Sequence, residues 1–597
     1  MRKFLGLVVF GMIIAIASVA VAAQPLFVAY PPANHKTIAD RIFLIGTAPP
    51  TGQVSVNGSQ ISRTAAGHFA PTFPLQIGEN VFSLRYENQL VKIQVTRQSN
   101  QPQVPAGLAF AKDSLMPKVD VASLPGEYIC FGAIAPANAT VLVKLAGATI
   151  PLKARSQVEL PDNKSVLLGE NSPIKKGGSE QYQGCAKTPA DSSLENSKKV
   201  DLGVPLFELT INNQTIGQQG TGKISILSPA ELEVAEVTSE PGVARTGAST
   251  DFSRMTPLPK GTRATVTGRE GEWIRLDYGA WIKASEVRIV KDAVPVRSII
   301  RSARSRQVSG WTEVLFPLET PVPVTVQEGE KTFTLTLYNT TAQTDIIRLD
   351  DDPVISRLAW QQILPLQVQY TFNLKSAQQW GYKLRYDGTT LVLSLKHPPV
   401  RSGKMPDPQE KPLSGIKILI DAGHGGPEDS GGVGPTGYRE KTVALIVSKL
   451  VRSELVNRGA NVVMTRVEDV DLDLPPRVEM IQKEEPAIAI SIHYNALPDN
   501  GDAINTKGVG AFWFHPQAHS LGMFLHNYLV AKLNRPSYGV FWNNLAMTRS
   551  AVAPSVLMEL GFMINPEEFE WIVNPTQQQK LAEAIAQGIT EWFASVE

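Results

Sequence analysis

Hydrophobic and polar positions alternate with a period of two residues over most of the N-terminal part of the chain. Short runs between Gln24 and Arg97 alternate in this way, and the run 78–95 does so on both sides of Glu87-Asn88. The stretch from Trp311 to Pro399 repeats the pattern, with Asp387-Gly388 as a hairpin signal. Because such alternation places every second side chain on one face of a sheet, it predicts β-rich modules.

The rhythm changes beyond about residue 414, where strand-like runs alternate with apolar residues at helical spacing. The expected helices are 442–458, 517–533 and 577–593, and the expected strands are 417–420, 461–464 and 487–492. Strands that alternate with helices are typical of a sheet that helices bury on both faces. We therefore expect a multidomain protein in which β-rich N-terminal modules precede a C-terminal α/β domain. Its 597 residues exceed what one hydrophobic core supports.

The first residues change the expected compartment. Arg2 and Lys3 precede an apolar run over 4–19, and Ala20-Val21-Ala22 supplies the small residues that a signal peptidase requires. We interpret 1–22 as a signal peptide, with an uncleaved anchor as the alternative. The mature protein is then exported.

Charge and cysteine content narrow the picture further. The chain has 57 lysine and arginine residues and 56 aspartate and glutamate residues, so its formal net charge is +1. This charge gives no reason to expect nucleic acid as a partner. The two cysteines, Cys130 and Cys185, form a disulfide in one reading and remain unpaired thiols in the other.

Two central segments resemble known wall-associated modules. Ala244–Ile282 contains an ARTGAS loop, an LPKGT turn and the strands GEWIRL and GAWI, and it resembles a bacterial SH3-like domain. Such modules bind cell-wall peptide or act as spacers, but the nearby Trp273 and Trp281 are equally expected as core residues. The strands of 311–399 resemble an AMIN domain, a family that targets enzymes to peptidoglycan. The basic segment 291–306 is interpreted as a solvated connector that could instead touch anionic wall polymer or lipid.

The candidate chemistry begins at Ile418–Gly432, ILIDAGHGGPEDSGG, where a strand leads into a glycine-rich turn. A P-loop requires a lysine that is absent here, and a dinucleotide loop requires G-x-G-x-x-G directly before a helix. The acidic Glu428 and Asp429 would also repel phosphate. We therefore reject a phosphate-binding loop.

A metal site is the better interpretation. His424 and His493 each follow a predicted strand, and the carboxyl ends of neighbouring strands in an α/β sheet converge. Glu440, at the start of a predicted helix, can add an oxygen, which makes three protein ligands and leaves a fourth position for water, as in catalytic zinc sites. Glu559 ends another predicted strand in an apolar setting that would raise its pKa toward that of a general base.

Taken in order, these motifs resemble the zinc-dependent N-acetylmuramoyl-L-alanine amidases. The matching stretches, over about 416–594, are IDAGHGG, GYREKTVAL, TR, PPRVEM, SIHYNA and MELGFMINPEE. The resemblance implies a mixed sheet flanked by helices, with His424, Glu440 and His493 as zinc ligands and Glu559 as the catalytic acid/base. It also implies hydrolysis of the amide bond between the lactyl group of N-acetylmuramic acid and L-alanine in peptidoglycan.

Three further residues are candidate substrate contacts. Arg466 and Arg477 suit recognition of peptide carboxylates, and Asn495 could orient groups near the site. A structural salt bridge is at least as good an explanation for both arginines.

Together these interpretations divide the chain into a signal peptide at 1–22, a small β-sandwich at 24–97, a β-rich domain with the cysteines at 107–230, an SH3-like domain at 234–290, an AMIN-like domain at 311–399 and a zinc amidase domain at 414–597. The signal peptide and the AMIN resemblance together favour a periplasmic, wall-associated protein.

Regulation and two competing functions stay open. Some relatives carry a long insertion after the second zinc histidine whose helix plugs the site, whereas here only a short polar loop follows His493. We expect a site that is not blocked in this way, with control from the N-terminal modules and room for a protein regulator. The alternatives are a zinc peptidase acting on another stem bond and a non-catalytic wall-binding or activator protein.

Overall fold

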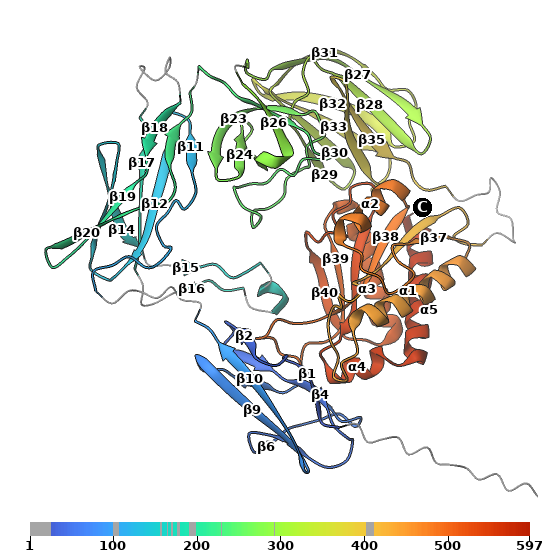
Figure 1. Cartoon of the computed structure of the whole chain (residues 1–597). Helices are drawn as coiled ribbons and strands as arrows, with labels where there is room; N and C mark the ends of the chain where they lie inside the picture. Colours follow the sequence, from blue (N-terminus) through green and yellow to red (C-terminus); the bar gives the residue numbers. More distant parts are fainter. Residues whose placement is uncertain are drawn as a thin grey trace, which may run out of the picture.

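The structure is a computed structural model that describes residues 25–596, except for 100–106, 156–157, 164, 169–170, 176–179, 190–198, 229, 292 and 401–410. The predicted signal peptide at 1–22 lies outside the described residues. Within the described part of the chain, no helix has both the length and the apolar character needed to cross a membrane. Figure 1 shows several β-rich units followed by a C-terminal α/β unit, as the hydrophobic pattern predicts.

The N-terminal unit consists of three small sheets around one core. β9 (Gly78–Tyr86) and β10 (Gln89–Arg97) form the predicted hairpin, and every second residue near their centres faces that core. The sheets have the strand orders β1-β4-β7, β2-β10-β9-β5-β6 and β3-β8. The other strands are β1 (Phe27–Tyr30), β2 (His35–Thr37), β3 (Arg41–Phe43), β4 (Ile45–Thr47), β5 (Val54–Val56), β6 (Ser59–Gln60), β7 (His68–Phe69) and β8 (Thr72–Pro74).

The next unit contains the cysteines. β12 (Tyr128–Ala135) pairs with β17 (Glu180–Lys187), and Cys130 and Cys185 lie opposite each other in this pair and form a disulfide. Their sheet has the order β12-β17-β14-β13-β19-β20, and the short strands β15 and β16 form a separate ribbon. The remaining bounds are β13 (Thr140–Leu145), β14 (Ala148–Arg155), β15 (Val158–Glu159), η1 (Ser165–Leu168), β16 (Ile174–Lys175), β19 (Leu206–Ile211) and β20 (Gln214–Gln219).

One sheet links this unit to the predicted SH3-like segment. It has the order β18-β21-β11-β23-β22-β26, with β24 and β25 attached to β23, so strands from both sides of residues 230–234 share it. Trp273 on β24 is buried in it, as expected for a core residue. The strands are β11 (Val121–Ser123), β18 (Val200–Gly203), β21 (Ile224–Ile226), β22 (Val234–Val237), β23 (Arg263–Glu270), β24 (Trp273–Leu276), β25 (Trp281–Lys283) and β26 (Val287–Val290), with the short helix η3 (Ala284–Glu286).

The segment 291–306 is not a simple connector, and that interpretation was wrong. Its second half belongs to β27 (Ser298–Val308), which pairs with β28 and β31 and buries Ile300 and Ala303. Arg301, Arg304 and Arg306 of this strand are exposed, and their charge masks its apolar positions in the sequence. The unit has two sheets, β31-β27-β28-β35-β34 and β29-β30-β33-β32. The bounds are β28 (Trp311–Pro317), β29 (Val324–Glu328), β30 (Thr332–Tyr338), β31 (Thr340–Arg348), β32 (Ile355–Leu364), β33 (Gln367–Leu374), β34 (Tyr382–Asp387) and β35 (Thr390–Lys396).

The C-terminal unit is a six-stranded mixed sheet with the order β37-β36-β38-β41-β39-β40. The first four strands of this order are parallel, whereas β39 runs antiparallel to β41 and carries β40 parallel to itself. The strands are β36 (Lys417–Ala422), β37 (Asn461–Met464), β38 (Ile488–Asn495), β39 (Val509–Trp513), β40 (Ser537–Trp542) and β41 (Ser555–Phe562).

Helices cover both faces of this sheet, as predicted. Ile418 and Ile420 share a core with α1, α3 and α5, while the intervening Leu419 packs with Ile481 of α2 on the other face. The helices are α1 (Glu440–Asn457), α2 (Leu474–Glu484), η4 (Pro516–Ala518), α3 (His519–Leu533), α4 (Pro566–Ile572) and α5 (Pro575–Val596). The parallel strands thus end together at one edge, where the candidate residues lie.

Candidate metal centre

His424 lies just beyond the end of β36, in a turn that the sequence forces into an unusual shape. Its backbone has a positive φ of 56°, and Arg477 holds its carbonyl oxygen with an N–H donated over 2.7 Å. The preceding Gly423 has no room for a side chain, because a Cβ there would meet the ring of His493 at 2.4 Å. The glycine therefore lets the two histidines approach each other.

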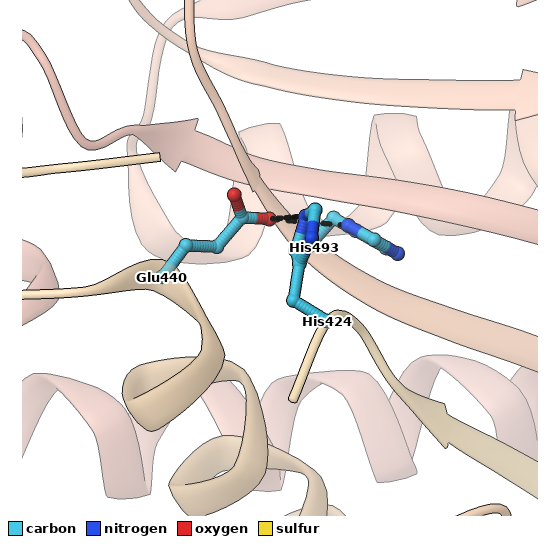
Figure 2. Close-up of side chains that lie close together, drawn as sticks. All are labelled: His424, Glu440 and His493. Carbon is cyan, nitrogen blue, oxygen red and sulfur yellow. Dashed lines mark hydrogen bonds and ion pairs between the residues drawn. The ribbon is translucent and has the colours of Figure 1, made fainter. Parts of the chain in front are cut away.

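Glu440 and His493 complete the cluster, which Figure 2 shows. Glu440 Oε1 lies 3.1 Å from Nε2 of His424 and 3.1 Å from Nδ1 of His493. The two imidazole rings are 4.9 Å apart between centroids and nearly perpendicular, at 77°. A helix start and two strand ends thus bring together three residues that are far apart in sequence.

The surroundings of Glu440 keep its carboxylate charged and fixed in orientation. Its Oε2 accepts the N–H of Gly432 over 2.7 Å, and Oε1 accepts the N–H of Tyr494 over 3.0 Å. Burial alone would raise the pKa of Glu440, but hydrogen bonds from His424 and His493 outweigh it and lower that pKa. A charged carboxylate at this position attracts a cation.

Protonation of His424 competes with metal binding. Burial opposes its charge, but hydrogen bonds and charge attraction from Glu440 and Asp429 dominate and raise the pKa of His424 to about 9. A metal ion that binds this nitrogen must displace the proton, so metal binding should release protons near neutral pH.

The donor set fits zinc. One ligand atom from each of His424, Glu440 and His493 lies within 4.8 Å of the others, and the described residues contain no other cluster of this kind. Two imidazole nitrogens and one carboxylate oxygen are ligands that zinc accepts in catalytic sites, where a fourth position stays open. The partly exposed side chains of His424 and His493, 24% and 15%, leave the cluster accessible from solvent.

Glu559 lies beside the cluster on the next strand, directly opposite His493 in the register of β38 and β41. Its Oε2 is shielded from solvent and has no hydrogen-bond partner among the described residues. Burial raises the pKa of Glu559 well above its usual value, and the negative charge of Glu440 adds to the rise. An unpartnered, strongly basic carboxylate is the group that a proton-transfer step requires.

Arg466 and Arg477 are almost completely buried and bond to the protein itself. Arg466 donates to the carbonyl oxygens of Ala422, Gly423 and Lys441 over 2.8–2.9 Å, and Arg477 pairs with Asp421 over 2.8 Å. These bonds hold the turn that carries His424. The substrate contact predicted for both arginines stays a prediction, whereas their present contacts are structural.

Asn495 ends β38, two residues beyond His493, and its side-chain oxygen accepts the N–H of Ala496 over 2.8 Å. Its substrate contact likewise stays a prediction.

Two residues near the site escaped the sequence reasoning. Asp429 Oδ1 lies 2.6 Å from Nδ1 of His424 and orients that ring, although the sequence analysis used this residue only as an argument against phosphate. Asp421 is buried and accepts hydrogen bonds from Thr465, Ser491 and Arg477. Asp429 follows a candidate ligand by five residues in a tight turn, and that spacing is the signal that could have revealed it.

Known proteins share this part of the chain. The profile of the N-acetylmuramoyl-L-alanine amidase family matches residues 418–591. The germination-specific N-acetylmuramoyl-L-alanine amidase of Bacillus subtilis is 34% identical over 203 residues, which cover 31% of this chain and 83% of that protein. The chain belongs to this amidase family.

Other amidases match a similar share of the chain. The probable cell wall amidase LytH of Staphylococcus aureus is 30% identical over 189 residues, which cover 31% of this chain and 62% of that protein. Among solved structures, the catalytic domain of CwlV, an N-acetylmuramoyl-L-alanine amidase from Bacillus (Paenibacillus) polymyxa var. colistinus, is 29% identical, covers 30% of this chain and 99% of its own, and gives a TM-score of 0.29. Both matches span about the length of the C-terminal unit.

Proposed function

We propose that this protein is a zinc-dependent hydrolase that cleaves the amide bond between N-acetylmuramic acid and L-alanine in peptidoglycan. One observation carries the proposal: the His424–Glu440–His493 cluster lies beside Glu559, whose buried Oε2 has no hydrogen-bond partner in the part of the chain that the structure describes. Membership of the amidase family supports the choice of bond.

Each residue has a distinct part in this reaction. His424, Glu440 and His493 would hold the metal. When bound there, zinc supplies Lewis-acid chemistry, which polarises a carbonyl oxygen and lowers the pKa of water. Asp429 holds the His424 ring, and Arg466 and Arg477 hold the turn behind it.

Glu559 moves the protons. Its Oε2 takes a proton from the attacking water while the water oxygen bonds to the lactyl carbonyl carbon. The same oxygen then gives that proton to the alanine nitrogen as the carbon–nitrogen bond breaks. The products are a free carboxylate on the lactyl group and a free amino group on L-alanine. Because the raised pKa of Glu559 makes it a stronger base than an exposed carboxylate, it suits this role.

The place of action follows from the substrate. Peptidoglycan lies outside the cytoplasmic membrane, so an exported, wall-associated protein is required. The predicted signal peptide and the resemblances of 234–290 and 311–399 to wall-associated modules support export and, with the AMIN resemblance, a periplasmic location.

Mass spectrometry of purified peptidoglycan tests the proposal. The full chain lacking residues 1–22 is incubated with the polymer, with and without a zinc chelator, beside the Glu559→Gln variant. We expect new L-alanine amino termini that are lost with the chelator and with the variant. Cleavage at another stem bond would reassign the substrate bond, and a zinc-loaded protein that cleaves nothing would refute the amidase activity for the protein acting alone.

A further inference from the structure

The N-terminal β-sandwich contacts the edge of the amidase unit at which the metal ligands lie. Figure 1 shows β1 and β4 beside the part of that unit containing α4. His68 on β7 packs edge-on against Phe569 of α4, with ring centroids 5.4 Å apart. Two units separated by more than 300 residues of sequence thus meet beside the site.

A shared apolar core fixes this contact. Phe43, Ile45 and Ala70 of the sandwich are 0–1% exposed, and they form one cluster with three buried residues of the amidase unit. Those three residues are Ala503, Phe562 and Ile564. Phe562 lies on β41 only three residues beyond Glu559. Burial of this completeness indicates a permanent interface, because apolar surface of this kind is costly to expose to water.

The sandwich also holds the loop 496–508, which directly follows the strand of His493. Asp499 of this loop accepts the hydroxyl proton of Tyr30 and lies 2.9 Å from Nε2 of His35. The side chains of His35 and Asp499 are each 19% exposed, so solvent screens this pair only partly. The whole of 496–508 is described, and it forms turns without a helix or strand. Its second half is held within the amidase unit, where Asp502 accepts the N–H of Ile504 and Asn565 donates to the carbonyl oxygen of the same residue. The contact with the sandwich therefore acts on the first half of the loop, around Asp499.

The loop between His424 and Glu440 meets the same surface. Gly434 of this loop packs so closely on Phe569 that a Cβ would lie 2.2 Å from its ring, and Gly437 lies against the ring of Phe27. Both loops that follow the metal-binding histidines thus rest on the sandwich or on the residue it packs against.

We propose that Asp499 is a positioning residue for the amidase reaction, through which Tyr30 and His35 of the N-terminal sandwich hold the loop that follows His493. This inference rests on the proposed function for its kinetic consequence only. The amidase unit then requires the sandwich for full activity, and the sandwich does not serve only to attach the enzyme to its surroundings.

The test uses the full chain lacking residues 1–22, with Asp499→Ala, Asp499→Asn and, as a matched control, Lys507→Ala. Lys507 lies in the same loop but pairs with the exposed Glu567 of the amidase unit. We expect Asp499→Ala to speed amide hydrogen exchange in 496–508 about tenfold and to lower kcat about tenfold with little change in KM, because a displaced loop misaligns the site. Asp499→Asn, which can still accept from Tyr30, should recover part of both losses, and Lys507→Ala should resemble the parent.

The proposal is overturned if Asp499→Ala has the parent's rate of amide hydrogen exchange in 496–508 and the parent's kcat. It is also overturned if Lys507→Ala changes the exchange rate and kcat as much as Asp499→Ala does. If Asp499→Ala fails to fold, the double variant Tyr30→Phe with His35→Gln replaces it from the sandwich side, with the same expected changes. A parent protein that cleaves no peptidoglycan would refute the proposed function, while the exchange rates of 496–508 would still decide whether the sandwich holds the loop.

Discussion

Two of the β-rich units that contact the amidase unit do so at opposite ends of its parallel strands. The N-terminal sandwich touches the carboxyl ends, where His424, His493 and Glu559 lie. The unit built from β27–β35 touches the other ends. Its Lys396 donates to the carbonyl oxygens of Glu485, Pro486 and Val552, which precede β38 and β41.

The two interfaces also differ in chemistry. The sandwich interface is an apolar core with a partly exposed polar contact of Asp499 with Tyr30 and His35. The other interface also has an apolar core, in which Trp311 packs with Leu419 and Ile481. It adds more polar contacts, because Trp311 donates to Glu485 over 2.9 Å and Lys383 pairs with the same carboxylate. Trp380 stacks on Phe593 of α5 at 5.9 Å. We therefore expect the first interface to alter catalysis through the loops and the second to alter mainly the attachment and stability of the units.

The largest effect is expected at Glu559, next to the sandwich interface. Glu559→Gln keeps the shape of the side chain but removes the proposed base, so kcat should fall by about 10²–10⁴-fold. Zinc content and the unfolding midpoint should stay near those of the parent, as measured by metal analysis and calorimetry. Activity within tenfold of the parent would show that another group carries the proton.

A matched pair of core truncations compares the interfaces directly. Phe43→Ala and Trp380→Ala each remove a buried aromatic side chain, 1% and 5% exposed, and each should cost about 3–5 kcal/mol of stability. At a temperature where both variants stay folded, only Phe43→Ala should lower kcat, because only it loosens the site edge. Denaturant unfolding and turnover of peptidoglycan fragments measure the two effects. Equal losses of kcat would remove the distinction between the interfaces.

Asp429→Asn tests the support of His424, a proposed metal ligand, without changing a residue of either interface. The amide pairs more weakly with His424 Nδ1, so zinc affinity should fall about tenfold, as is usual for the outer partner of a ligating histidine. Competition with a fluorescent chelator gives the affinity. Unchanged affinity would mean that Asp429 plays no part in orienting the ring.

The smallest effect concerns Lys396 and pH. Burial, which outweighs the attraction of Glu485, lowers the pKa of Lys396 from its ordinary 10.5 to about 7. Between these values the unfolded chain holds a proton that the folded chain has released, so stability should rise with pH, by about 1 kcal/mol from pH 7 to pH 8. In Lys396→Met this part of the rise should disappear. Denaturant unfolding of parent and variant at both pH values measures the free energy of unfolding. The same rise from pH 7 to pH 8 in both proteins would contradict the lowered pKa of Lys396.

The sequence predicted much of the fold because many elements carry a local signal. The apolar spacing in 442–458 corresponds to α1, and the alternation in 78–95 corresponds to the β9–β10 hairpin. Helix α2 was not predicted from the sequence. It is short, has two prolines near its start and buries only Arg477 and Ile481, so its sequence shows no apolar stripe. Strand β27 escaped because exposed arginines masked its apolar positions.

The sequence by itself determined which residues could serve as ligands and base. His424, Glu440, His493 and Glu559 each lie at a strand end or helix start, and the rule that parallel strands end at one edge suffices to bring them together. The sequence did not predict what supports them. Only the tertiary structure decided that Asp421 and Asp429 lie behind the site and that the N-terminal sandwich covers its edge. The physical reason is that periodicity encodes which face of an element is apolar, whereas the partner of that face depends on shape complementarity between distant surfaces.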